Sequence, residues 1–181
     1  CAERILGKGE RMRFQIGDVV VHPLHGAGII TGFKKLQPQG NIRRYYEIKL
    51  LRRNETNLMI PVQECEDIGM RPAISTNRLG EVWDTFRQSP NSLPDNHRSR
   101  YKLLKDKMQT GDIYQIAEAV RDIAWRRQQR DGLTQKSKEI FKQALRLLAG
   151  EIAAAKQIEL ETAQEQVQER LRAAIPQPES A

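Results

Sequence analysis

The sequence predicts an α+β protein in which a small β-barrel or strongly bent sheet precedes an all-α helical domain. Up to Pro72, short runs rich in β-branched residues alternate with Gly, Pro and Asn turn signals. After it, apolar residues recur at the three- and four-residue spacing of helices. A chain of 181 residues has room for two small domains. We expect four segments: residues 1–11 as an upstream extension before Met12, a β domain at 12–72, a helical domain at 73–156, and an acidic tail at 157–181 that begins helical and frays toward Pro176.

Four strands are expected in the first domain. Each is a short apolar run, and Gly28 and Gly32 are candidates for a bend or bulge in the second. Pro38, Gly40 and Asn41 mark a hairpin tip between the second run and the third. The runs lie at residues 19–21, 27–33, 45–51 and 57–62.

The second domain shows helical periodicity broken by capping signals. Asn and Pro residues at 88–96 predict a linker after the first helix, and Gly111 ends the second. Asp112 and Thr134 are placed to cap the two helices that follow them. The apolar faces are Leu79, Val82, Trp83 and Phe86; Tyr101, Leu104 and Met108; Ile113, Ile116, Ala117, Val120 and Ile123; and Ile140, Phe141, Ala144, Leu145, Leu148 and Ile152.

Composition and charge narrow the function classes. No apolar run approaches the roughly 20 residues of a membrane-spanning helix, and two cysteines cannot form a disulfide framework, so we expect a cytoplasmic protein. The net charge is +7. Residues 78–156 hold sixteen Lys and Arg against ten Asp and Glu, whereas residues 157–181 hold two against five. A basic helical domain predicts an anionic partner, most often nucleic acid.

The stretch His22-Pro23-Leu24-His25-Gly26 raises the question of a metal site. Pro23 and Gly26 favour a turn between two strands, and no third ligand stands at a recognisable spacing. A metal-dependent hydrolase using His22 and His25 is therefore the weaker hypothesis. We expect no metal, no cofactor and no enzyme activity, because neither a nucleophile–base arrangement nor a phosphate-binding glycine loop is apparent.

A longer pattern resembles a known family. Phe14, Ile16, Gly17, Asp18, Val20, Val21, Pro23, His25, Gly26 and Gly28 are similar to the start of the CarD family of bacterial transcription regulators. The resemblance continues through Ile60-Pro61, Ile68-Gly69-Met70-Arg71, Ser99-Arg100-Tyr101-Lys102, Thr110-Gly111-Asp112, Val120-Arg121-Asp122 and Gly132-Leu133-Thr134. The transcription-repair coupling factor carries the same first module, but this chain has no helicase motifs.

The resemblance implies a regulator that stabilises the promoter open complex. Its Tudor- or SH3-like barrel would bind the β subunit of RNA polymerase, and its helical domain would touch double-stranded promoter DNA near the upstream edge of the melted bubble. We expect a monomer without a membrane partner. The implied polymerase-binding residues are Lys34, Lys35, Leu36, Leu58 and Met59. Met59 departs from the family, which often has a basic residue there.

The residues implied in DNA binding cluster at helix ends, where free N–H groups and cationic side chains suit phosphates. They are His97, Arg98, Arg100, Lys102, Arg126, Arg127 and Lys138. Aligning Arg100-Tyr101-Lys102 on the family pattern puts His97 where the family commonly has a tryptophan that wedges into the minor groove. The alternative reading of this surface is a solvated basic face.

A second function class remains open at this point. Small barrels also occur in RNA-binding or translation-linked adaptors. The expected strands lack the aromatic pairs on which single-stranded RNA stacks, which favours the transcription regulator.

Overall fold

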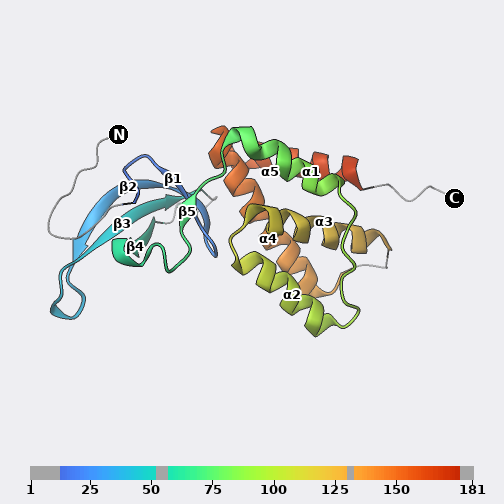
Figure 1. The fold of residues 1–181 in the computed structure, drawn as a ribbon, viewed down its shortest axis with the longest axis horizontal. Helices are drawn as coiled ribbons and strands as arrows, with labels where there is room; N and C mark the ends of the chain where they lie inside the picture. The colour runs from blue at the N-terminus through green and yellow to red at the C-terminus, as the bar shows by residue number, and fades with distance from the viewer. Residues whose placement is uncertain (1–12, 52–56, 130–132, 176–181) are drawn as a thin grey trace.

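The computed structural model describes residues 13–51, 57–129 and 133–175. Figure 1 shows the strands at one end of the molecule and the helices at the other, so the α+β prediction is confirmed. We call the part up to Pro72 the sheet domain and the part after it the helical domain.

One antiparallel sheet forms the sheet domain. Within the described residues it has five strands in the order β4-β3-β2-β1-β5. The four expected strands are present, and the two-residue β5 beside β1 was not expected. Their bounds are β1 Val19–His22, β2 Gly26–Leu36, β3 Arg43–Leu50, β4 Asn57–Pro61 and β5 Arg71–Pro72.

The sheet encloses its own hydrophobic core, which includes Ile30, Tyr46 and Met70. Gly28 allows the strands to approach closely, because a Cβ atom there would lie 2.6 Å from Cγ2 of Ile48. The β2–β3 register shifts between Ile30 and Gly32, which agrees with the expected bulge. Short 3-10 turns lie at Pro38–Gly40, Val62–Glu64 and Thr76–Arg78.

Five helices form the helical domain within the described residues: α1 Leu79–Arg87, α2 His97–Gln109, α3 Ile113–Gln129, α4 Gln135–Lys156 and α5 Leu160–Ala174. The expected caps form. The side chain of Thr134 accepts a hydrogen bond from the Ser137 N–H, and that of Asp112 accepts one from the Tyr114 N–H. Gly111 ends the preceding turn with φ +68°, a conformation that glycine adopts without strain.

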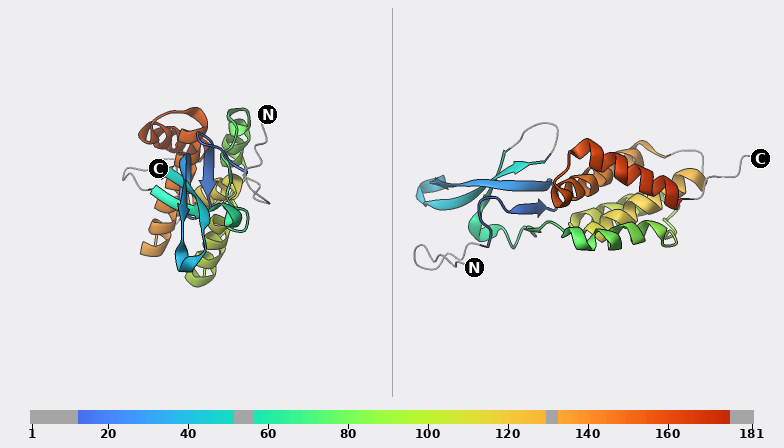
Figure 2. Two further views of the ribbon diagram at one scale, coloured as in Figure 1. Left: turned by 90° about the vertical axis from the view of Figure 1, so that its left-hand side faces the viewer. Right: turned by 90° about the horizontal axis from the view of Figure 1, so that it is seen from above.

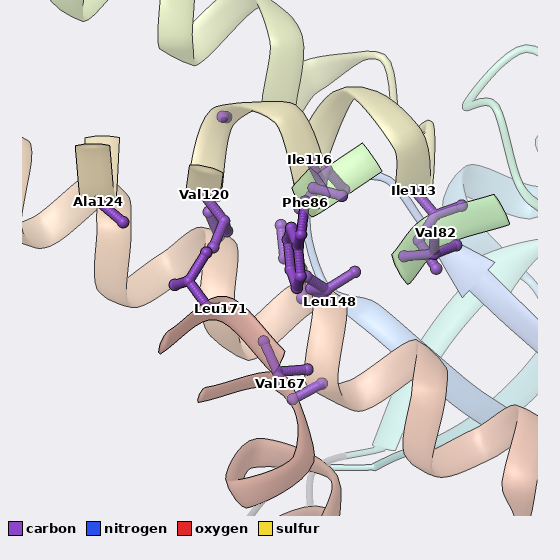
Figure 3. Close-up of a cluster of buried hydrophobic side chains, with 14 of the residues drawn as sticks. Val82, Phe86, Ile113, Ile116, Val120, Ala124, Leu148, Val167 and Leu171 are labelled. Atoms are coloured by element: carbon purple, nitrogen blue, oxygen red, sulfur yellow. The ribbon is translucent and has the colours of Figure 1, made fainter. Parts of the chain in front are cut away.

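Helix α5 takes a part in the core of the helical domain that was not expected from the sequence. Ala163, Val167 and Leu171 of α5 are buried in the same core as Phe86 of α1 and Leu148 of α4. Figure 3 shows Val167 and Leu171 together with Phe86 and Leu148. Their spacing of four residues is that of a core-facing stripe, which the Ala-, Glu- and Gln-rich composition concealed. The acidic segment is therefore helical, as expected, but it completes the helical domain as far as Ile175.

The two domains touch along a small apolar contact. Val21 and Ala27 of the sheet pack with Ala154 of α4. A Cβ atom on Gly26 would lie 3.2 Å from Cδ2 of Leu147, so α4 approaches the β1–β2 turn closely. Figure 2 shows the start of β2 beside the end of α4.

Candidate functional site

The predicted polymerase-binding residues fall on two strands on either side of β3. Met59 on β4 pairs with Glu47 on β3, and the carboxylate of Glu47 accepts a hydrogen bond from Lys34 Nζ on β2 at 2.6 Å. Leu36 pairs with Arg43 at the far end of the hairpin and is 44% exposed. The structure therefore brings Lys34, Leu36 and Met59 onto one outward face, since residues two apart on a strand share a face.

The other two predicted residues lie differently. Leu58 pairs with Ile48 and packs against the core of the sheet domain. Lys35 is exposed, but it pairs with Arg44 and so points to the face opposite that of Lys34. We therefore define the candidate strand surface as Lys34, Leu36, Glu47 and Met59.

An open strand edge borders this surface. In the described part of the sheet, β4 pairs with β3 alone, so one side of Asn57–Pro61 has no strand neighbour. Such an edge presents main-chain donors and acceptors to which an extended segment of a partner can add.

Helix α2 presents the first group of predicted DNA-binding residues. The Asn96 side chain caps the helix by accepting hydrogen bonds from the Arg98 and Ser99 N–H groups. His97, Arg98 and Lys102 are exposed on the first turns of α2. The cap fixes the start of the helix, so these side chains project from a rigid base rather than from the linker before it.

Arg100 and Arg126 do not project with them. Arg100 is only 6% exposed, and its guanidinium donates hydrogen bonds to the Pro94 and Asp95 carbonyls at 2.7 and 2.9 Å. Arg126 is largely buried and donates to the Asp95 carboxylate at 3.3 Å. Both arginines therefore hold the segment before α2. The sequence alone does not show whether an arginine binds such a backbone segment or a phosphate.

Two further predicted residues lie at the junction of α3 and α4. The Arg127 guanidinium lies 5.7 Å from the centre of the Phe141 ring, and Lys138 is exposed on the first turn of α4. The C-terminal end of α3 and the start of α2 lie at the end of the helical domain that is farther from the sheet (Figure 1). We define the candidate basic end as His97, Arg98, Lys102, Arg127, Lys136 and Lys138.

A buried charged network that sequence reasoning missed supports this end. The fully buried Asp122 carboxylate accepts hydrogen bonds from Arg121 and from the backbone N–H of Asn91 in the linker. Arg121 also donates to the Thr85 carbonyl at the end of α1, and Lys107 of α2 lies 3.7 Å from Asp122. The network ties α1, the linker and α2 to α3, although these partners are far apart in sequence.

The histidine pair serves the β1–β2 turn. Nδ1 of the buried His22 accepts hydrogen bonds from the Leu24 and His25 N–H groups at 3.1 and 3.3 Å. Burial, and to a lesser extent the neighbouring His25, hold the pKa of His22 below its ordinary value. Within the described ranges, His, Cys, Asp and Glu form no group of three that could hold a metal ion.

The chain thus combines a sheet domain that has an open edge with a helical domain that has a basic end, and comparison with known proteins shows which family has this arrangement. Residues 14–74 match the CarD-like/TRCF RID domain, an RNA polymerase-interacting domain, and residues 81–168 match the CarD C-terminal domain. The chain is also 32% identical over 145 residues to the "Putative transcription factor YdeB" of Bacillus subtilis (strain 168), covering 80% of this chain and 94% of that protein. The chain belongs to the CarD family.

Family membership confirms the transcriptional part of the prediction. The sheet domain is an RNA polymerase-interacting domain, and the protein is a transcription regulator without enzyme activity. In the part of the chain that the structure covers, no helix is both long and apolar enough to cross a membrane.

Proposed function

We propose that this protein binds the β subunit of RNA polymerase through the candidate strand surface and promoter DNA through the candidate basic end, and that the two contacts together stabilise the open complex. Lys34, Leu36 and Met59 lie on one face beside the open edge of β4. This favours addition of a polymerase strand to β4, with side chains of the outward face supplying selectivity.

The observation that carries the DNA part is the convergence of exposed cations from three helices. Lys136 of α4 lies over the Tyr101 ring of α2, and Arg127 of α3 lies over the Phe141 ring of α4. These contacts bring cations that are distant in sequence to one end of the domain. Cations on rigid helix ends suit contacts with phosphates, which position a protein on DNA without reading its sequence.

Three features of His97 support a role as the wedge residue. It is the first residue of α2, it is exposed, and the Asn96 cap fixes the backbone beside it. An imidazole ring offers a smaller stacking face than an indole ring, so the contribution of His97 to holding an opened base step is modest.

A single chain can bind both partners without a second copy, so the proposal takes the protein as a monomer. It acts in the cytoplasm, the bacterial compartment that holds RNA polymerase and the chromosome.

Retention of RNA polymerase by variants of the full chain tests the first half of the proposal. Met59→Glu places a like charge beside Glu47 and a charge on the outward face, and we expect it to abolish most of the retention. Ser75→Glu adds the same charge at an exposed position beyond β5, at the other edge of the sheet, and serves as the matched control. Equal retention by both variants would contradict the assignment of the polymerase contact to this surface.

A further inference from the structure

Three sequence motifs that are far apart in the chain meet where the two domains join. Pro23, of the β1–β2 turn, lies between Gly69, which precedes β5, and Gly111, which links α2 to α3. A Cβ atom would lie 3.3 Å from the Pro23 ring if placed on Gly69, and 3.1 Å if placed on Gly111. Both glycines have positive φ, +79° and +68°. Their missing side chains leave the space that the buried proline occupies.

Arg71 closes this junction with hydrogen bonds. Its guanidinium binds the Glu151 carboxylate of α4 through two bonds of 2.6 and 2.8 Å. The same guanidinium donates to the Gly111 carbonyl at 2.5 and 3.0 Å. One side chain of β5 thus holds both α4 and the α2–α3 turn.

Glu151 is the buried partner in this arrangement. It is 1% exposed, and besides the two bonds from Arg71 it accepts one of 2.9 Å from the Ile74 N–H in the segment between β5 and α1. A buried carboxylate without its partner is costly, so this ion pair tolerates little displacement of one domain against the other. The two-bond geometry also restricts the angle between the two domains, because both bonds form only when the guanidinium and the carboxylate lie in one plane.

The junction lies between the two proposed contact surfaces. β2 runs from Gly26 at the junction to Leu36 on the strand surface, about 33 Å at roughly 3.3 Å per residue. α4 runs from Lys136 at the basic end to Glu151 at the junction, about 22 Å at 1.5 Å per residue. A rotation of 10° at the junction would move the far end of β2 by about 6 Å over that length, more than a hydrogen bond can follow.

We propose that Arg71 and Glu151 are positioning residues, which fix the two domains in the one orientation that lets the chain hold polymerase and DNA at the same time. The inference rests on the proposed function and goes beyond it. Neither residue touches a partner; each acts through the orientation of the surfaces at the two ends.

The competing explanation is a simple tether. Two binding domains joined by any short linker gain affinity from their effective concentration alone. Loss of the ion pair would then leave the open complex as stable as before. The two explanations differ in a quantity that can be measured, because only the positioning account requires a single orientation.

Glu151→Gln in the full chain separates them. It keeps the size of the side chain and an oxygen for the Ile74 N–H but removes the charge that Arg71 binds. Glu118→Gln is the matched control, since Glu118 pairs with Lys107 at 2.7 Å within the helical domain. If Glu151→Gln does not fold, Arg71→Met with Glu151→Leu removes both charges and leaves no unpaired one.

Three readouts are taken for each variant: binding to polymerase alone, binding to duplex DNA alone, and the lifetime of preformed open complexes after addition of a competitor. A fourth is the distance distribution between spin labels on Asp67→Cys and Glu169→Cys, both exposed, in a background that carries Cys1→Ser and Cys65→Ala. We expect Glu151→Gln to keep both separate affinities, broaden the distance distribution and lose most of the lifetime extension. Glu118→Gln should match the wild type in all four.

The outcomes distinguish this inference from the proposed function. If Glu151→Gln extends the lifetime of the open complex as much as the wild type does, the positioning role is overturned, whether or not the distribution of label distances broadens. Unchanged distances with a shortened lifetime also overturn it, because orientation is then not the cause. A wild-type protein that does not extend the lifetime at all refutes the proposed function, and the inference falls with it.

Discussion

The ammonium nitrogen of Lys136 lies 5.7 Å from the centre of the Tyr101 ring, which joins the first turn of α4 to the second turn of α2. Tyr101 is 38% exposed, so this cation–π contact forms at the surface. It keeps the cations of both helices on one side without neutralising their charge. The basic end is therefore a prearranged cationic surface, and its properties can be tested one residue at a time.

Lys102→Gln should lower the affinity for duplex DNA and make it less sensitive to salt. If Lys102 contacts a phosphate, the slope of log affinity against log salt should fall by about 0.9, the value for one phosphate contact. Binding titrations at several salt concentrations measure this slope. Lys156→Gln, at an exposed position at the opposite end of α4 from the basic end, should leave the slope unchanged. Equal slopes for the wild type and Lys102→Gln would remove Lys102 from the interface.

Arg98 and Arg100 are two residues apart, but we expect Arg98 to contribute to DNA binding and Arg100 to the stability of the fold. Arg98→Leu should weaken DNA binding and change the free energy of unfolding by no more than about 0.5 kcal/mol, because Arg98 is exposed. Arg100→Leu should lower that free energy by about 1–3 kcal/mol, since it leaves the Pro94 and Asp95 carbonyls without their donor. Denaturant unfolding gives the free energies, and a stable Arg100→Leu protein would argue against an anchoring role.

His97 should limit the lifetime of the open complex. His97→Trp provides a larger ring to stack on an opened base step and should lengthen the lifetime, while His97→Ala should shorten it modestly. Lifetimes are measured by challenging preformed complexes with a competitor. Ser99→Trp puts the same ring at an exposed position on another side of α2 and should not lengthen it. Identical decay for all variants would leave DNA contact to the Arg and Lys residues alone.

The order of strands and helices could be predicted because each depends on local patterns. Val19 to Val21 read as a strand, and the caps at Asp112 and Thr134 lie where the residue types place them. The part that helix α5 takes in the core was not predicted, because its stripe of Ala163, Val167 and Leu171 contains one alanine and is surrounded by polar residues. Small apolar side chains give little periodic signal, although they allow close packing in the core.

The chemistry at the two surfaces was less predictable, because sequence does not show which charge is buried. Arg100, Arg126 and Lys138 look alike in a row of basic residues, yet Arg100 and Arg126 hold the linker and Lys138 is exposed. The bond between Arg71 and Glu151 joins residues 80 positions apart, and no local spacing indicates such a pair. Long-range polar partners of this kind require the fold itself.

The stability of the protein should fall as the pH is lowered from neutrality. His22 has a folded-state pKa below its ordinary value of 6.5, because burial disfavours the charged ring. Below about pH 6.5, His22 takes up a proton more readily in the unfolded chain than in the folded one. The stability that neutral His22 contributes is therefore fully present above that pH and is lost as the pH falls through the folded-state pKa. Protonation would also take Nδ1 from the Leu24 and His25 N–H groups.

Thermal unfolding between pH 7.5 and 5.5 measures this effect, since most carboxylates titrate below that range. His22→Gln should flatten the pH dependence, whereas His25→Gln should preserve most of it, because burial is the larger cause of the shift. A wild-type midpoint that rises on acidification would show that the sign is wrong.

The lifetime of a preformed promoter open complex, with and without the full-length protein, tests the central claim most directly. Complexes of purified RNA polymerase and promoter DNA are challenged with a competitor, and their decay is followed. A protein that holds the β subunit through the β4 edge and DNA through the basic end should slow the decay, and Met59→Glu and Lys102→Gln should each reduce the effect. Decay that is equally fast with and without the wild-type protein would contradict the account.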